Sequence, residues 1–304
     1  MLRACVTPRL APEGEPDVAL VHASSQYRPT RVLILGSAGF VGSSVLRHLE
    51  AAGVTVVGLP RTDLDLSDAD ASDRLASLLR PDDTLVFAAA DAPVKNNKML
   101  LNNLRMAEAV CAALSQQPVA HLVYISSDAV YADAPLPLDE ESPTSPSSLH
   151  GVMHLAREVM LANAGPAAFC IVRPTLIYGP GDPHNGYGPN QFLNLVQQGL
   201  PITLFGEGEE RRDHVHIDDV ADLVARIVSH QSTGVLNAAT GNVVSFREAA
   251  ETVISASSAE IVIDTRPRSG PMPHGGYRPF DPGATHRAFP DFAYRTLTEG
   301  LAGA

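Results

Sequence analysis

The feature that most constrains this chain is the stretch RVLILGSAGFVG, residues 31–42. Its apolar run stops abruptly at Gly36, which is typical of a strand buried on both faces of a parallel sheet. From Phe40 onward apolar residues recur at helical spacing until Gly53, and a second apolar run follows at 54–59. A strand, a glycine-rich turn, a helix and another strand form a βαβ unit, whose crossover connection requires a parallel sheet.

The same alternation continues along the chain. Further buried-strand patterns lie at 84–89, 121–126 and 169–174, with helical patterns at 99–115 and 149–163. After residue 178 glycine, proline and asparagine interrupt the regularity, and a helix at 216–230 and a strand at 234–240 return the chain to the sheet. The alternation predicts an α/β fold with a doubly wound parallel sheet, the Rossmann architecture.

The division of the chain follows from these patterns. Residues 1–29 lack sustained apolar periodicity, and we expect a poorly ordered N-terminal extension. A capping box at Ser245 and Glu248 starts a helix of a second lobe. We predict a dinucleotide-binding domain at 30–178 and 213–240, and a smaller, discontinuous α/β substrate lobe at 179–212 and 241–304.

Composition limits the possible partners. A formal net charge of -12 argues against nucleic acid or an anionic membrane, because either would require a basic face. No apolar stretch approaches the roughly 20 residues that span a bilayer, so we expect a cytoplasmic protein. The three cysteines are far apart and form no C-x-x-C pair, which disfavours a disulfide framework or a thiolate metal site.

The glycine turn is the first motif that indicates chemistry. Gly36, Gly39 and Gly42 let the backbone turn tightly, let a pyrophosphate approach, and let the helix pack closely on the strand. The first helical amides, at Phe40 and Val41, can receive the anion. The turn therefore predicts a dinucleotide site.

The spacing G-x-x-G-x-x-G resembles the extended short-chain dehydrogenase/reductases, the nucleotide-sugar epimerase and dehydratase family. Ordered matches continue over about residues 31–300. They are NNLRMAEAV (102–110), YISSDAVYAD (124–133), RPTLIYGPG (173–181), RRDHVHIDDVA (211–221) and GVLNAATGNVVSFRE (234–248). The resemblance implies that the first lobe binds NAD or NADP, that the second encloses a nucleotide sugar, and that chemistry occurs between them.

The choice of dinucleotide depends on the end of the second strand, where an acidic residue would bind the ribose of NAD. Here Pro60 occupies that place and Arg61 follows, and a guanidinium can pair with the 2'-phosphate of NADP. This loop resembles the NADPH-using GDP-fucose synthases and dehydrorhamnose reductases. NADP is favoured, while NAD, with Arg61 as a plain surface charge, stays open. The resemblance adds four further cofactor contacts, at Asp65, Leu66, Ala88 and Ala89.

The family's catalytic group is a Ser or Thr with a Tyr and a Lys four residues apart on one helix. Ser127 matches the hydroxyl that binds the reacting sugar oxygen. Asp128 occupies the place of the dehydratases' catalytic aspartate, but Ala129 stands where they carry glutamate, which argues against the usual dehydratase route. Asn103 matches a helix asparagine that supports the active-site water or backbone, and a purely local hydrogen bond is its alternative.

The catalytic helix departs from the family pattern. HGVMHLARE places His150 at the position of the tyrosine and His154 at that of the lysine. An unperturbed imidazole already titrates near neutral pH, so His150 can serve as the general acid/base. His154 can orient the cofactor ribose or tune its partner through charge. Three alternatives stay open: catalysis by a nearby Tyr such as Tyr187, a non-catalytic binding or sensor protein of the same fold, and a zinc pair, which lacks a third ligand.

The substrate contacts are less specific. Arg212 matches an arginine that contacts the nucleotide diphosphate, and Arg211, Arg266, Arg268 and Arg278 are further cationic groups. Leu176 departs from an asparagine that binds the ligand in many relatives. We expect Tyr187 and Asn190 to line the sugar pocket. The sequence thus predicts an NAD(P)-dependent epimerase or reductase acting on a sugar, assembled as a homodimer as is common in the family, with no metal.

Overall fold

The computed structural model describes residues 20–23, 27–183, 185–257 and 260–302. A central sheet has seven strands in the order β1-β10-β6-β5-β4-β2-β3, all parallel except β1, which pairs antiparallel with β10. The doubly wound parallel sheet expected from the sequence is confirmed. The strands are β1 (Leu20–Val21), β2 (Arg31–Leu35), β3 (Val56–Leu59), β4 (Asp83–Phe87), β5 (His121–Ile125), β6 (Phe169–Pro174) and β10 (Thr233–Ala238).

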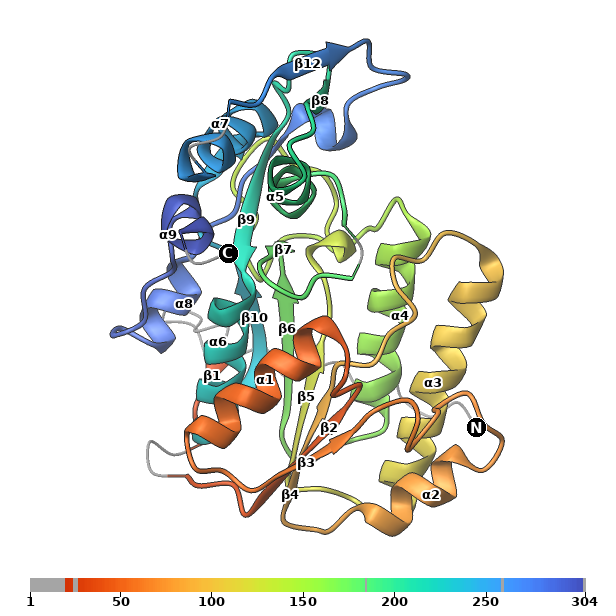
Figure 1. The fold of residues 1–304 in the computed structure, drawn as a ribbon. Coiled ribbons are helices and arrows are strands. Elements are labelled where there is room, and N and C mark those ends of the chain that lie inside the picture. The colour runs from red at the N-terminus through yellow and green to blue at the C-terminus, as the bar shows by residue number, and fades with distance from the viewer. Residues whose placement is uncertain (1–19, 24–26, 184, 258–259, 303–304) are drawn as a thin grey trace.

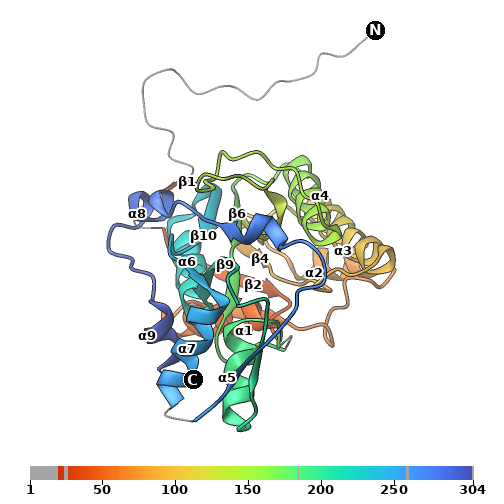
Figure 2. The same ribbon diagram turned by 90° about the horizontal axis from the view of Figure 1, so that it is seen from above.

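Helices cover both faces of this sheet (Figures 1 and 2). In β2, Val32 and Ile34 pack into the core on one face, and Leu33 and Leu35 pack into the core on the other. Burial on both faces is the reason why this strand is apolar at consecutive positions. One face carries α1 (Phe40–Ala51) and α6 (Ile217–His230), and the other carries α2 (Ala71–Leu78), α3 (Asn97–Gln116) and α4 (Leu149–Asn163).

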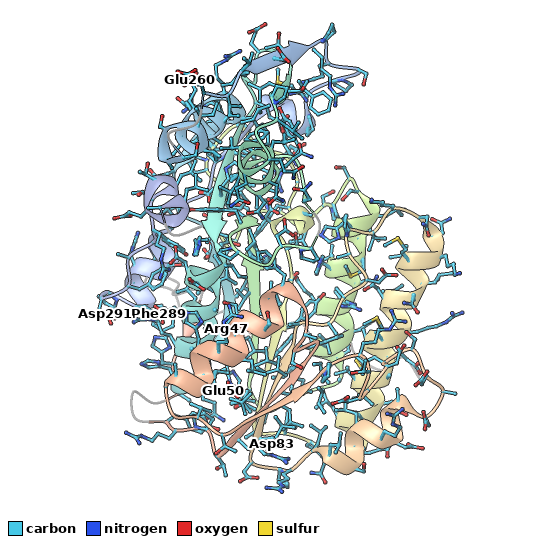
Figure 3. The ribbon with its side chains drawn as sticks, viewed as in Figure 1. Arg47, Glu50, Asp83, Glu260, Phe289 and Asp291 are labelled. Carbon is cyan, nitrogen blue, oxygen red and sulfur yellow. The ribbon has the colours of Figure 1, made fainter. Side chains whose placement is uncertain are left out.

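The strand order reverses at β2, because β3 lies on one side of it and β4 on the other. Connections leave β2 and β4 in opposite directions there, and such a switch point opens a crevice at the carboxyl ends of the strands. At the opposite end of the sheet Arg31, at the start of β2, donates two hydrogen bonds to the buried Asp83 at the start of β4. Figure 3 shows Asp83 at that lower edge, far from the second lobe.

The second lobe lies above the carboxyl edge of the central sheet (Figure 1). Its strand β9 connects the lobes, since it pairs with β7 near the central sheet and with β11 and β13 in the lobe. The expected capping box is confirmed by hydrogen bonds between Ser245 and Glu248 of 2.6 and 3.1 Å. The remaining strands are β7 (Leu176–Tyr178), β8 (Ile202–Phe205), β9 (Arg211–His216), β11 (Val243–Ser245), β12 (Ile263–Arg266) and β13 (Tyr277–Arg278), and the helices are α5 (Pro189–Gln197), α7 (Phe246–Ser257), α8 (Gly283–Ala288) and α9 (Leu297–Leu301).

Two segments lie elsewhere than the sequence patterns suggested. Within the expected extension 1–29, Leu20 and Val21 form the edge strand β1, because the buried Leu20 side chain fills part of the main core. Residues 1–19 and 24–26 are outside the described part of the chain. Near the C-terminus, Phe289 and Phe292 pack into the same main core, although the sequence pattern assigns 241–304 to the substrate lobe. Both rings lie beside Arg226 of α6, a contact that the local sequence pattern does not reveal.

Within the described residues, every helix is too short or too polar to cross a lipid bilayer.

A buried ion pair attaches α4 to the sheet. Arg173, on β6, donates to both carboxylate oxygens of Glu158, at 3.0 and 2.7 Å. Ser126, at the end of β5, donates to the same carboxylate at 2.5 Å. A third bond runs from Arg173 to the Tyr131 hydroxyl, which donates to Asn237 on β10. This network fixes the helix that carries both histidines relative to three strands of the sheet.

We predict that Glu158→Gln lowers the free energy of unfolding by about 3 kcal/mol, because it leaves a buried guanidinium without its counter-charge. Urea unfolding measures the change. The matched control is Asp291→Asn, which removes a surface partner of Arg226 and should leave the unfolding midpoint almost unchanged. Equal midpoints for wild type and Glu158→Gln would contradict the role assigned to the buried pair.

Candidate active site

A cavity of about 790 Å³ opens at the carboxyl edge of the central sheet and extends toward the second lobe. It lies at the switch point beside β2 and β4, the position that α/β sheets use for ligands. Most residues singled out in the sequence line this one cavity. They are Gly36, Gly39, Phe40, Val41, Arg61, Asp65, Leu66, Ala88, Ala89, Ser127, Asp128, His150, His154 and Arg212.

The glycine turn has the close packing that a dinucleotide site needs. Gly36 has a φ of +82°, and a Cβ there would lie 2.7 Å from the Ala89 Cα atom. A Cβ at Gly42 would lie 2.2 Å from the Gly36 carbonyl oxygen, so any larger residue would push α1 away from the turn. Gly42 does not itself line the cavity. The turn therefore leaves its backbone accessible beside the first amides of α1, as a pyrophosphate requires.

Arg61 lies at the entrance to the cavity with most of its side chain exposed, and it donates a 2.8 Å hydrogen bond to Asp65. The backbone amide of Ser67 and then Arg61 lower the pKa of Asp65, so this carboxylate is ionised at neutral pH. A cofactor phosphate at this place would have to share the guanidinium with Asp65.

Ser127 and Asp128 follow β5 and begin a short 3-10 helix, Asp128–Val130. The Ser127 Oγ atom accepts from the Ala129 amide at 3.2 Å, and its own proton stays available in the cavity or reaches Asp128 at 3.4 Å. Asp128 is buried and accepts from the Arg278 Nε atom at 3.1 Å. This carboxylate lines the cavity while it is held in an ion pair, which orients it beside Ser127, and a catalytic role for it stays a prediction.

The two histidines lie one turn apart on α4. Their rings meet edge to face with centroids 4.7 Å apart, and both line the cavity. Gly151 allows α4 to approach the backbone at Ala129, since a Cβ at this position would lie 2.0 Å from the Ala129 carbonyl oxygen. The helix can therefore lie directly against the segment that carries Ser127, and His150 faces the same cavity as the serine.

His154 is buried, and this burial lowers its pKa well below the usual value, with smaller contributions from His150 and Arg157. A lowered pKa favours the neutral ring at physiological pH, and of the two roles expected for His154 it favours orientation of the cofactor ribose over an effect of charge. Its Nδ1 atom lies 2.8 Å from the Tyr124 hydroxyl. When the Tyr124 hydroxyl donates to this Nδ1 atom, the hydrogen of the neutral ring lies on Nε2 and can be donated there.

Asn103 does not line the cavity. Its side chain accepts from the Asp91 amide at 3.0 Å and donates to the Asp91 carbonyl at 2.9 Å. Arg157, which is fully buried, donates to Asn103 and to the Ala89 carbonyl. Asn103 also donates to the Met99 carbonyl one helical turn earlier at 2.9 Å, so the local bond and the support of the loop that follows β4 are both present.

Comparison with known proteins supports the assignment made from these features. The model of the NAD dependent epimerase/dehydratase family matches residues 32–239. The chain belongs to this family.

Two curated UDP-glucose 4-epimerases are similar to it. The one from Azospirillum brasilense is 27% identical over 288 residues, covering 80% of this chain and 82% of the relative. The one from Mycolicibacterium smegmatis is 30% identical over 231 residues, covering 64% and 72%. Among solved structures, the UDP-glucose 4-epimerase of Thermus thermophilus in complex with NAD has a TM-score of 0.76 at 26% identity and covers 90% of this chain and 96% of its own. The chain is thus an enzyme of the NAD-dependent epimerase/dehydratase type.

Two residues expected in the sugar pocket of this family member lie outside the cavity. Tyr187 packs among Phe192, Phe205 and Phe246, and its hydroxyl accepts from the Phe205 amide at 3.1 Å. It belongs to the core of the second lobe, so it is not placed to act as an alternative base. Asn190 bonds to the Gly179 amide at 2.9 Å and to Asp182 at 2.7 Å, and holds the loop between them. The sequence does not reveal the packing of Tyr187 because Phe205 and Phe246 come from later segments, whereas Asn190 bonds within its own loop.

Sequence reasoning missed four residues beside the site. Tyr124 and Arg157 read as ordinary strand and helix residues, although Arg157 lies three positions after His154 and hence on the same helix face. His274 lines the cavity and contacts Asp133, but it comes from a loop without regular pattern. Glu210 precedes the arginine pair in EERRDHV and contacts Arg212. A run of charged residues such as this is typical of an exposed segment, so the sequence does not indicate that the Glu210 carboxylate is buried.

We predict that Gly151→Ala reduces turnover at least tenfold while cofactor affinity changes little. The added methyl group forces α4 away from Ala129 and separates His150 from Ser127, whereas the glycine turn is not in contact with it. Steady-state kinetics and cofactor titration measure the two effects. Gly165→Ala, just beyond the end of the same helix, is the control: a φ of +68° makes alanine strained there and lowers stability, but nothing lies within 4 Å of the added methyl group, so the kinetics of the folded protein should stay near wild type. Turnover equal to wild type in Gly151→Ala would show that the close approach of α4 is not needed.

Proposed function

We propose that this protein is an NAD(P)-dependent epimerase or reductase of a sugar, with a nucleotide sugar as substrate and His150 in place of the usual tyrosine as acid/base. One observation carries the proposal. Ser127, His150 and His154 line a single cavity that has the glycine turn at one end and Arg212 toward the second lobe. Hydroxyl, imidazole and guanidinium thus face the same space in the order that an extended sugar diphosphate would need.

The residues of the site divide the work by chemistry. When bound, the nicotinamide supplies a hydride acceptor or donor. His150 takes a proton from the sugar hydroxyl as it is oxidised, or returns one to the carbonyl oxygen. The Ser127 hydroxyl donates to the same oxygen and stabilises the charge that develops on it. The Nε2 hydrogen of His154 would be donated to a ribose hydroxyl of the cofactor and would help to hold the nicotinamide end in place.

The similarity to known enzymes supports a nucleotide sugar. Curated relatives are UDP-glucose 4-epimerases, and solved structures of similar fold include complexes with UDP-glucose and NAD. In this chain Arg212 is the cavity-lining residue whose planar fork suits a diphosphate. Either an epimerase that regenerates its cofactor or a reductase that exchanges it is compatible with the site.

A homodimer is part of the proposal. Leu101 on α3 and Val152 and Val159 on α4 are exposed on adjacent helices. Apolar side chains gathered on one helical face favour burial against a second copy of the same face.

We predict that NADP binds more tightly than NAD and that Arg61→Ala removes most of this preference, by tenfold or more in the ratio of dissociation constants. The guanidinium would leave Asp65 and pair with the 2'-phosphate of NADP, for which NAD has no counterpart. Fluorescence titration with both reduced cofactors measures the ratio, and Arg74→Ala serves as a control because it removes a nearby exposed guanidinium paired with Asp68. A preference for NAD in the wild type would contradict the role of Arg61.

We predict that His150→Phe keeps its cofactor affinity and loses turnover by about 100-fold or more, the usual contribution of a general acid/base. Ser127→Ala should also lower turnover with cofactor binding retained. Activity should also fall toward acid pH, because protonation of a neutral imidazole base removes its ability to accept a proton. We assign this loss to His150, since burial keeps the pKa of His154 well below its usual value. Cofactor titration and a nucleotide-sugar panel give both readouts.

Two results would contradict this proposal. Equal turnover by wild type and His150→Phe would exclude the imidazole as acid/base. No turnover by the wild type on any member of the panel, with cofactor bound, would favour a binding protein of the same fold.

A further inference from the structure

Glu210 lies between Arg212, which lines the cavity, and Arg268, which does not. Its carboxylate contacts the Arg212 guanidinium at 3.5 Å and the Arg268 guanidinium at 3.1 Å. The Glu210 side chain is only 5% exposed, so solvent screens these contacts weakly. The carboxylate therefore offsets part of the positive charge that Arg212 offers to an anionic ligand in the cavity.

The surrounding charges leave no excess positive charge for such a ligand. Arg212 also approaches Asp128 at 3.9 Å, and the buried Arg278 contacts Asp128 and Asp133. The cluster contains as many arginines as carboxylates within the described residues. Its members are Arg212, Arg268 and Arg278 with Asp128, Asp133 and Glu210.

Arg268 nevertheless has unused donors. Its Nε and Nη2 atoms are buried and find no hydrogen-bond partner in the described part of the chain. A buried guanidinium is stable only when most of its donors are satisfied, and a carboxylate on Nη1 alone leaves it short. Arg268 thus has donors for a second anionic group in addition to Glu210.

We propose that Glu210 is a specificity-determining residue that competes with the anionic part of the substrate for Arg212. This inference rests on the proposed function, because it assumes that Arg212 receives the diphosphate of a nucleotide sugar. The ligand gains the full charge of the Arg212 guanidinium only as Glu210 gives up its contact with it. A carboxylate in this position therefore limits the affinity for a diphosphate and favours a ligand that brings hydrogen-bond donors for Glu210 itself.

The test is binding of UDP and of inorganic pyrophosphate to the full-length protein, measured by calorimetry at fixed salt. Glu210→Gln removes one negative charge a few ångströms from the ligand while keeping the side-chain volume, and both probes should bind about tenfold more tightly. Glu207→Gln is the matched control. The exposed Glu207 carboxylate pairs with Arg247 of α7, and its loss should leave both affinities unchanged.

The sign of the effect separates competition from simple positioning. If Glu210 only orients the arginines for the ligand, Glu210→Gln will weaken binding, and weaker or equal binding overturns the inference. Absence of binding by both proteins overturns it as well. Arg268→Gln provides a second measurement if Glu210→Gln does not fold: at least tenfold weaker pyrophosphate binding supports the inference and unchanged binding refutes it. A failure of the proposed catalytic mechanism can be distinguished from a failure of this inference, because the mechanism is tested by the turnover of His150→Phe and the inference by ligand affinity.

Discussion

The buried pair of Glu158 and Arg173 is the interaction on which the rest of this site depends. It joins the middle of α4 to β6, and Ser126 attaches the same carboxylate to β5. Two charges taken out of water are tolerated here because each carboxylate oxygen and each bonded guanidinium nitrogen has a partner of good geometry. The main effect of the pair is therefore to fix the position and rotation of α4 relative to the sheet, and with them the placement of His150 and His154 in the cavity, rather than to add net stability.

Close backbone approach provides the second constraint. Gly36 and Gly42 bring α1 against the turn after β2, and Gly151 brings α4 against Ala129. A side chain at any of these places would collide with backbone atoms, which cannot move aside as a flexible side chain can. The cofactor end and the catalytic end of the cavity are thus positioned by the same means, glycine contacts on two helices that pack on opposite faces of one sheet.

Much of this arrangement could be predicted from the sequence because it follows local patterns. Consecutive apolar residues marked strands buried on both faces, glycine spacing marked the turn, and Gly151 and Glu158 set the register that places both histidines. Long-range contacts could not be predicted in the same way. The edge strand at Leu20, the aromatic packing of Tyr187 and the pairing of Glu210 with Arg268 join segments far apart in sequence, and no spacing rule records them.

The histidine pair poses a chemical problem that the structure makes specific. The family resemblance implies a lysine whose positive charge promotes ionisation of the catalytic tyrosine, whereas burial, with smaller effects of His150 and Arg157, lowers the pKa of His154 and favours its neutral form. It cannot supply that charge. An imidazole at position 150 does not require it, since a neutral ring accepts a proton directly and need not first become an anion. In the proposed mechanism an imidazole in place of the tyrosine therefore removes the need for the lysine's charge, and the second histidine keeps the ability to donate a hydrogen bond. That donor is the Nε2 atom when the Tyr124 hydroxyl donates to Nδ1, 2.8 Å away.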